Sequence, residues 1–191
     1  MGDRDLGRTL LAIARSAIGS ELGFAVDVAD SHEALGRPAA TFVTLTQRGD
    51  LRGCIGTLEA FRPLGADVRA NAVAAAFRDP RFHPLAIDEF ETIAVEVSLL
   101  ARPEPVRVVD EAALRAVLRP GIDGVVIEYG RHRATFLPQV WEALGEPRDF
   151  LAALKRKAGL PGDFWSAQVK VARYGVTKWA EREFLPSEQV R

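Results

Sequence analysis

Residues 39–58 read AATFVTLTQRGDLRGCIGTL, and this stretch decides the expected fold. Thr, Val and Phe favour β-strands and the pair Gly49-Asp50 suits a tight turn, so the stretch predicts a β-hairpin. With Gly49 and Asp50 at the centre of the turn, Leu45 faces Cys54 across the hairpin. A three-residue turn with a bulge shifts this register by one residue.

The second strand of the hairpin combines a cation, a thiol and two glycines. Alternation places Arg52, Cys54, Gly56 and Leu58 on one face and Leu51, Gly53, Ile55 and Thr57 on the other. Residues two apart on a strand lie roughly 7 Å apart, so Arg52 is expected to favour the thiolate of Cys54. Gly53 and Gly56 mark a close approach by a ligand or another backbone. Alternatively, Cys54 is a small buried hydrophobe and the glycines admit a packed side chain.

Outward from the hairpin, apolar spacing predicts further helices and strands. Helices are expected over 6–22, 63–78, 110–118, 138–144 and 147–158, a buried strand over 92–101, a second hairpin over 124–137 and a last strand over 167–178. Each half of the chain therefore offers a hairpin followed by helix, which suggests a duplication. We expect a single domain over 1–191, with the Pro-rich stretch 102–106 as a boundary between two lobes.

Composition excludes several classes of function. Lys and Arg total 25 and Asp and Glu total 26, so the net charge is −1 and neither nucleic acid nor an anionic membrane is an expected partner. The single cysteine, the absence of a signal-peptide pattern and the lack of a long apolar run favour a cytoplasmic protein. His32, His83 and His132 show no zinc spacing, and one thiol cannot hold an iron–sulfur cluster, so no metal or cofactor is expected.

The segment DPRFHPL, after the Ala-rich helix, supplies three more candidates. His83 is a possible base for Cys54 if this loop folds over the hairpin, and otherwise a surface residue. Asp79 and Arg81 form a local ion pair or line a pocket; alternatively, they cap the helix end and clasp the loop.

Two polar residues interrupt apolar segments. Asn71, in the Ala-rich helix, either bonds to the hairpin or faces a cleft. Glu96, in the strand TIAVEVSLL, needs a partner for its carboxylate, and Arg52 and Arg81 are the candidates.

Together these residues resemble the AMMECR family. The resemblance is carried by LRGCIGTLEA, NAVAAAFRDPRF, VEVSLL, DGVVIEYGRHRATFLPQVWE and the Trp and Glu of KWAE, and LRGCIGT is the family's signature. The resemblance covers nearly the whole chain, from about the first helix to Glu181. It implies an α+β fold with a barrel-like, mostly antiparallel sheet built from two hairpin–helix units. Helices would pack outside the sheet, and the signature would face a cleft between a larger and a smaller lobe.

The name of the prokaryotic form, AmmeMemoRadiSam system protein A, implies two partners. They are a Memo-type protein and a radical S-adenosylmethionine protein, and this chain would bind or present their substrate. The expected ligand-binding residues are Arg52, Gly53, Gly56, Thr57, Asn71, Asp79, Arg81 and Glu96. The alternative is a free-standing thiol enzyme in which Cys54 is the nucleophile and His83 or Glu96 the base.

Overall fold

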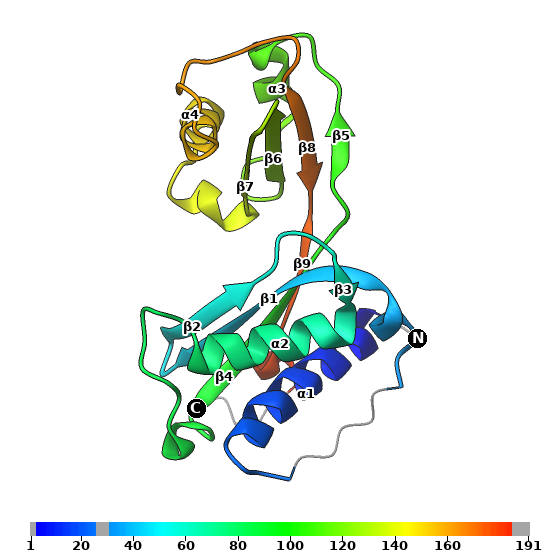
Figure 1. Ribbon diagram of the computed structural model, residues 1–191, viewed down its shortest axis with the longest axis vertical. Coiled ribbons are helices and arrows are strands. Elements are labelled where there is room, and N and C mark those ends of the chain that lie inside the picture. The colour runs from blue at the N-terminus through cyan, green and yellow to red at the C-terminus, as the bar shows by residue number, and fades with distance from the viewer. Residues whose placement is uncertain (1–2, 26–30, 185–191) are drawn as a thin grey trace. The chain divides into compact units, whose positions relative to one another are not determined.

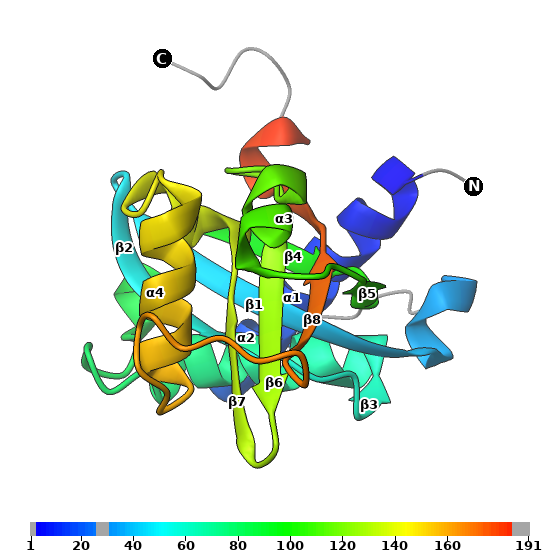
Figure 2. The same cartoon turned by 90° about the horizontal axis from the view of Figure 1, so that it is seen from above.

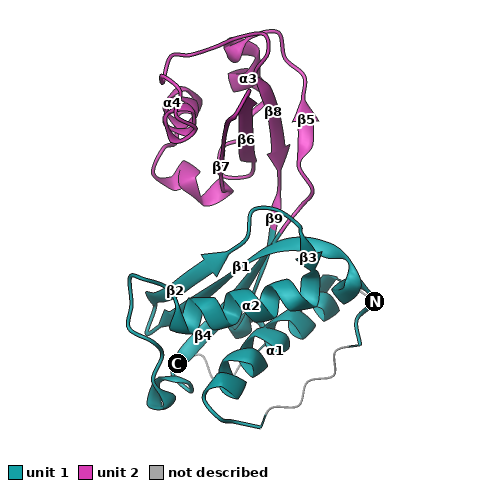
Figure 3. Cartoon of the chain, viewed as in Figure 1, with its two compact units in different colours: residues 1–99, 177–191 teal, residues 100–176 magenta. Residues whose placement is uncertain are grey.

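The computed structural model describes residues 3–25 and 31–184, and the chain divides into two compact units. Unit 1 comprises residues 1–99 and 177–191, and unit 2 comprises residues 100–176 (Figure 3). The chain therefore leaves unit 1 a few residues before the stretch 102–106 and returns to it near the C-terminus.

Unit 1 is a sheet with helices packed on one face (Figure 1). Its elements are α1 Asp3–Glu21, η1 Glu33–Gly36, β1 Pro38–Gln47, β2 Asp50–Gly56, β3 Arg62–Pro63, α2 Leu64–Phe77, η2 Ile87–Glu89, β4 Ile93–Leu100, β9 Val176–Ala180 and η4 Glu181–Glu183. The strand order is β2-β1-β4-β9, with β3 also paired to β1. Apolar residues of α1 at helical spacing, such as Leu10, Ile13 and Ala17, are buried against Val43 and Val95 of the sheet.

Unit 2 repeats this plan with its own core. Its elements are β5 Glu104–Val106, α3 Glu111–Val117, β6 Gly124–Tyr129, β7 His132–Phe136, η3 Pro138–Glu142, α4 Pro147–Lys157 and β8 Lys170–Tyr174. The strand order is β5-β8-β6-β7, and α4 packs beside β7 (Figure 2). The rings of Trp141 and Phe150 stack with centroids 3.7 Å apart in the core of this unit.

The expected α+β class with antiparallel strands is confirmed, whereas the barrel-like sheet is not. The described strands form two separate sheets and no closed barrel, because each unit surrounds its own hydrophobic core. The strand expected over 167–178 is two strands, β8 and β9, which meet at Gly175 where the chain passes between units. Within residues 3–25 and 31–184, no helix is long and apolar enough to cross a membrane.

Candidate functional site

The hairpin that carries the signature residues 51–57 turns one residue earlier than expected. Arg48 and Gly49 both have positive φ, 53° and 90°, as a two-residue hairpin turn requires. Cys54 pairs with Thr44 of β1 and not with Leu45. The expected register is wrong by one residue at Cys54, because the earlier turn shifts the pairing by two residues and a bulge further along β2 restores one of them.

Arg52 is a bulged residue of β2. Leu45 pairs with Gly53 and Thr46 with Leu51, so Arg52 has no residue opposite it. A bulge re-aims the side chain that it carries. The Arg52 guanidinium donates from Nε and Nη2 to the two carboxylate oxygens of Glu89, at 2.9 and 2.8 Å.

The Arg52–Glu89 pair is largely buried, with the two side chains 13% and 23% exposed. The Arg52 hydrogen bond and the backbone N–H of Ala86 lower the pKa of Glu89 to about 2. Nη1, the third guanidinium nitrogen, is buried and has no hydrogen-bond partner among the described residues. Phe82 lies beside this group, with its ring centroid 6.0 Å from Cζ of Arg52. A shallow pocket of about 350 Å³ at the start of β2 is lined by Gln47, Arg48, Asp50, Leu51 and Arg52.

Asp79 and Arg81 clasp the backbone of Cys54. Oδ2 of Asp79 accepts the N–H of Cys54 at 2.9 Å, and Nη2 of Arg81 donates to its carbonyl oxygen at 3.2 Å. Because β2 ends the sheet, the pair occupies the position where a further strand would bond (Figure 1). Hydrogen bonds from Arg81 hold the pKa of Asp79 well below its usual range. The structure therefore shows the expected local ion pair, and this pair clasps strand β2.

The thiol of Cys54 is partly exposed, and its sulfur accepts the hydroxyl of Thr44 at 3.3 Å. Arg81, whose pKa is raised by Asp79 and more weakly by Cys54, is the cation that contacts Cys54, in place of the expected Arg52. His83 lies exposed in its loop. Among the described residues, neither a histidine nor a carboxylate hydrogen-bonds to the sulfur.

Glu96 lies apart from the signature. Its carboxylate pairs with Nζ of Lys178 on β9 at 3.6 Å, and not with Arg52 or Arg81 as expected. The sheet order explains this, since β1 separates β4 from β2.

Both signature glycines are required for close packing. A Cβ on Gly53 would lie 2.1 Å from the carbonyl oxygen of Ala75 in α2, and one on Gly56 would lie 2.2 Å from the Phe42 ring. Gly53 therefore marks the close approach of another backbone, which was one of the two interpretations, and Gly56 admits a packed side chain, which comes from strand β1 and not from a helix.

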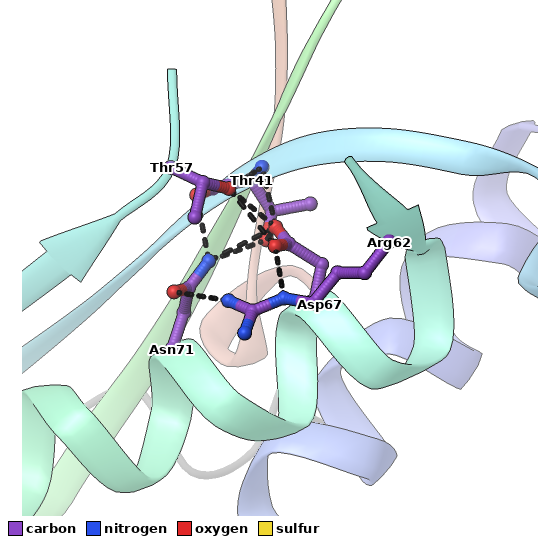
Figure 4. A network of polar contacts seen from close by, with 5 residues as sticks. All are labelled: Thr41, Thr57, Arg62, Asp67 and Asn71. Atoms are coloured by element: carbon purple, nitrogen blue, oxygen red, sulfur yellow. Dashed lines mark hydrogen bonds and ion pairs between the residues drawn. The ribbon is translucent and has the colours of Figure 1, made fainter. Parts of the chain in front are cut away.

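A buried carboxylate on α2 brings Thr57 and Asn71 together (Figure 4). Asp67 is 0% exposed and accepts the N–H and hydroxyl of Thr41 at 2.8 and 2.6 Å, the hydroxyl of Thr57 at 2.8 Å and Nε of Arg62 at 2.7 Å. Nδ2 of Asn71 donates to Asp67 at 3.0 Å and to the carbonyl oxygen of Thr41 at 2.9 Å. Asn71 therefore bonds to the hairpin, which was one of its two interpretations.

Sequence reasoning missed Thr41, Arg62 and Asp67. One signal was present, because Asp67 and Asn71 are four residues apart and so share one face of an Ala-rich helix. The described residues contain no group of three or more His, Cys, Asp or Glu side chains that could hold a metal ion.

Acid is expected to weaken unit 1 through Glu89. The pKa of Glu89 is lowered from 4.5 to about 2 in the folded chain. The ionised carboxylate therefore contributes fully to the free energy of unfolding above pH 4.5, and this contribution is lost as the pH falls towards 2. Urea midpoints of the wild type and Glu89→Gln, measured from about pH 6 to about pH 3, should therefore converge as the pH falls. Parallel curves across this range would show that Glu89 contributes no pH-dependent stability.

Comparisons with known proteins agree with this fold. The AMMECR1 family model matches residues 11–179. A protein of Methanothermobacter thermautotrophicus is 40% identical over 176 residues, which cover 90% of this chain and 92% of that protein. A protein of Saccharolobus islandicus is 39% identical over 183 residues, covering 90% and 80%. The crystal structure of the uncharacterized protein PH0010 from Pyrococcus horikoshii superposes with a TM-score of 0.77 at 32% identity, covering 92% of this chain and 91% of that one. This chain therefore belongs to the AMMECR1 family.

Proposed function

We propose that this chain is the substrate-binding component of a three-protein system, with a Memo-type protein and a radical S-adenosylmethionine protein as its partners. The observation that carries the binding role is the spare donor of Arg52. Nη1 is buried without an acceptor among the described residues, and a buried guanidinium N–H in that state is costly. An oxygen of a bound substrate, from a carboxylate, a phosphate or a carbonyl, would remove this cost.

The surroundings of Arg52 suit binding. Two of its nitrogens are held by Glu89, so the guanidinium is already oriented before a ligand arrives. The guanidinium of Arg81 is likewise held by Asp79, and its Cζ lies 5.5 Å from the centroid of the same Phe82 ring that Arg52 approaches. The site therefore offers two oriented guanidinium groups, each paired with a carboxylate, around one aromatic ring and beside the pocket at the start of β2. The partner enzyme would supply the radical chemistry.

A second candidate function, a thiol enzyme, is favoured by one contact. The hydroxyl of Thr44 donates to the sulfur of Cys54 at 3.3 Å, a contact that orients the sulfur. In this candidate Cys54 is the nucleophile and the nearby charge of Arg81 supports it.

One reconstitution experiment separates the two functions. The chain and its two purified partners would be supplied with S-adenosylmethionine and a small-molecule extract of the host cells, and extract-dependent release of 5′-deoxyadenosine would be measured. For a binding component, Arg52→Lys should lower this release about tenfold, because lysine cannot both hold Glu89 and present the spare donor. Cys54→Ala should leave it unchanged.

The matched control is Arg37→Lys, since Arg37 forms an exposed pair with Glu33 at 3.7 Å, away from β2. Loss of release in Cys54→Ala together with full release in Arg52→Lys would assign the thiol function instead. Equal release with and without this chain would contradict the proposed binding role.

A further inference from the structure

The sheet of unit 2 has one face that its helices leave uncovered. Along β6, Val125 and Ile127 are buried in the core to which α3 and α4 contribute, so Val126 between them points to the opposite face. The strand register brings Pro105 of β5 and Ala172 of β8 into one row with Val126. These three residues line a hollow of about 460 Å³ across the face, which we name the unit 2 groove, and none of its described lining residues belongs to a helix.

The lining of the unit 2 groove is aliphatic and charged. It consists of five valines, an alanine, a proline, an arginine, a lysine and a glutamate. None of these described residues carries a hydroxyl, an amide or an aromatic ring, so the groove offers neither the polar side chains that bind a sugar nor the rings that stack on a nucleobase. Its volume lies within the range of small-molecule sites, roughly 300–1,000 Å³. The ligand that fits this lining is therefore recognised by an aliphatic body and a charge.

Two exposed cations of the groove have no ion-pair partner among the described residues. The pairing of β5 with β8 ends at Val106 and Val171, and Arg107 and Lys170 are the next residues on the two chains. Both line the groove. Like charges on neighbouring strands repel each other, and a bound anion would remove that cost.

The groove keeps a net positive charge despite its glutamate. Glu128 is the one acidic residue of the described lining, and its Oε2 pairs with Nε of Arg133 on β7 at 4.0 Å. Two cations and one carboxylate give the lining a charge of +1. A single carboxylate neutralises this charge, whereas a phosphate group, with about −1.5 to −2 at pH 7, exceeds it.

We propose that the unit 2 groove is a binding site for an aliphatic carboxylate. The carboxylate accepts charge-assisted hydrogen bonds from Arg107 and Lys170. The aliphatic chain lies along the row of Pro105, Ala172 and Val126, where it is removed from water. The signature residues belong to unit 1 and the groove to unit 2, so this inference does not rest on the proposed function.

The test is a titration of the ¹⁵N-labelled full chain with sodium octanoate, followed by the chemical shifts of the backbone amides. The amides of residues 106–108, 126–128 and 169–172 should shift together and saturate, with a Kd of about 1 mM or lower. Acetate carries the same head group without the chain, and octylammonium carries the same chain with the opposite charge. Both should therefore bind at least tenfold more weakly than octanoate.

Two double variants locate the head group. Arg107→Gln/Lys170→Gln should weaken octanoate binding at least tenfold, because it removes both cations and leaves the aliphatic lining in place. Arg115→Gln/Arg148→Gln is the matched control, since it makes the same change in net charge at exposed arginines of α3 and α4, and its Kd should equal that of the wild type. The amide spectrum of each variant shows in the same experiment whether unit 2 remains folded.

The site would be overturned if the amides of the groove showed no saturable shift, or if the double variant at Arg107 and Lys170 bound octanoate as tightly as the wild type. Equal affinities for acetate and octanoate would overturn the recognition of the aliphatic chain. Equal affinity for octylammonium, or tighter binding of octyl phosphate, would overturn the assignment of the ligand as a carboxylate.

Discussion

The Asp67→Ala variant is expected to lose about 3–5 kcal/mol of unfolding free energy, the cost of removing one partner from a buried ion pair. Asp67 accepts hydrogen bonds from β1, from the residue that follows β2, from β3 and from its own helix. Its removal leaves the N–H and hydroxyl of Thr41 and the guanidinium of Arg62 short of an acceptor. The loss should be visible as a lower urea midpoint, followed by circular dichroism.

Two measurements localise that loss. Hydrogen exchange of residues 41–57 should accelerate more than exchange in unit 2, because the network lies entirely within unit 1. Asp88→Ala, at an exposed carboxylate of the same unit, is the matched control and should change the unfolding free energy by less than about 0.5 kcal/mol. A loss below about 1 kcal/mol for Asp67→Ala would mean that the network rearranges around water at little cost.

The Gly53→Ala variant is expected to lose about 3 kcal/mol, near the upper end of the usual cost of overpacking. The added Cβ would stand 2.1 Å from the carbonyl oxygen of Ala75, and a helix backbone atom cannot move aside as a flexible side chain can. Strand β2 must therefore separate from α2, which also displaces Arg52 and Cys54. Denaturant unfolding measures the loss.

Gly36→Ala is the control for this prediction. Gly36 has no atom within 4 Å of an added Cβ and no positive φ, so alanine should be tolerated within about 0.5 kcal/mol. Equal stability of Gly53→Ala and the wild type would show that β2 and α2 are not rigidly packed, and the fixed geometry proposed around Arg52 would lose its basis.

Much of the fold was predictable from the sequence because the signals are local. The helix over 63–78, the second hairpin over 124–137 and the helix over 147–158 are found within a residue or two of their expected bounds. Strands β3 and β5 were missed because two or three residues are too short to show a period. The same limit explains why the division of the strands between two sheets was not foreseen, since it depends on which strands pair over long distances.

The contacts within the site were predictable from the sequence only where the two interacting residues are close together in the chain. Asp79 and Arg81, two residues apart, form the pair that their spacing allows. Arg52 and Glu89 are separated by 37 residues, and no pattern connected them.

The sequence by itself therefore determined the family, the α+β class and the strand that carries Arg52 and Cys54, because periodicity and the LRGCIGT signature are properties of neighbouring residues. Only the tertiary structure decided which partners these side chains have. A one-residue shift of the turn and a bulge at Arg52 direct its guanidinium to Glu89, and the contact of Gly53 with α2 places Asp79 and Arg81 on the backbone of Cys54. Register and helix packing are set by the whole core, so residues distant in the chain meet only once that core has formed.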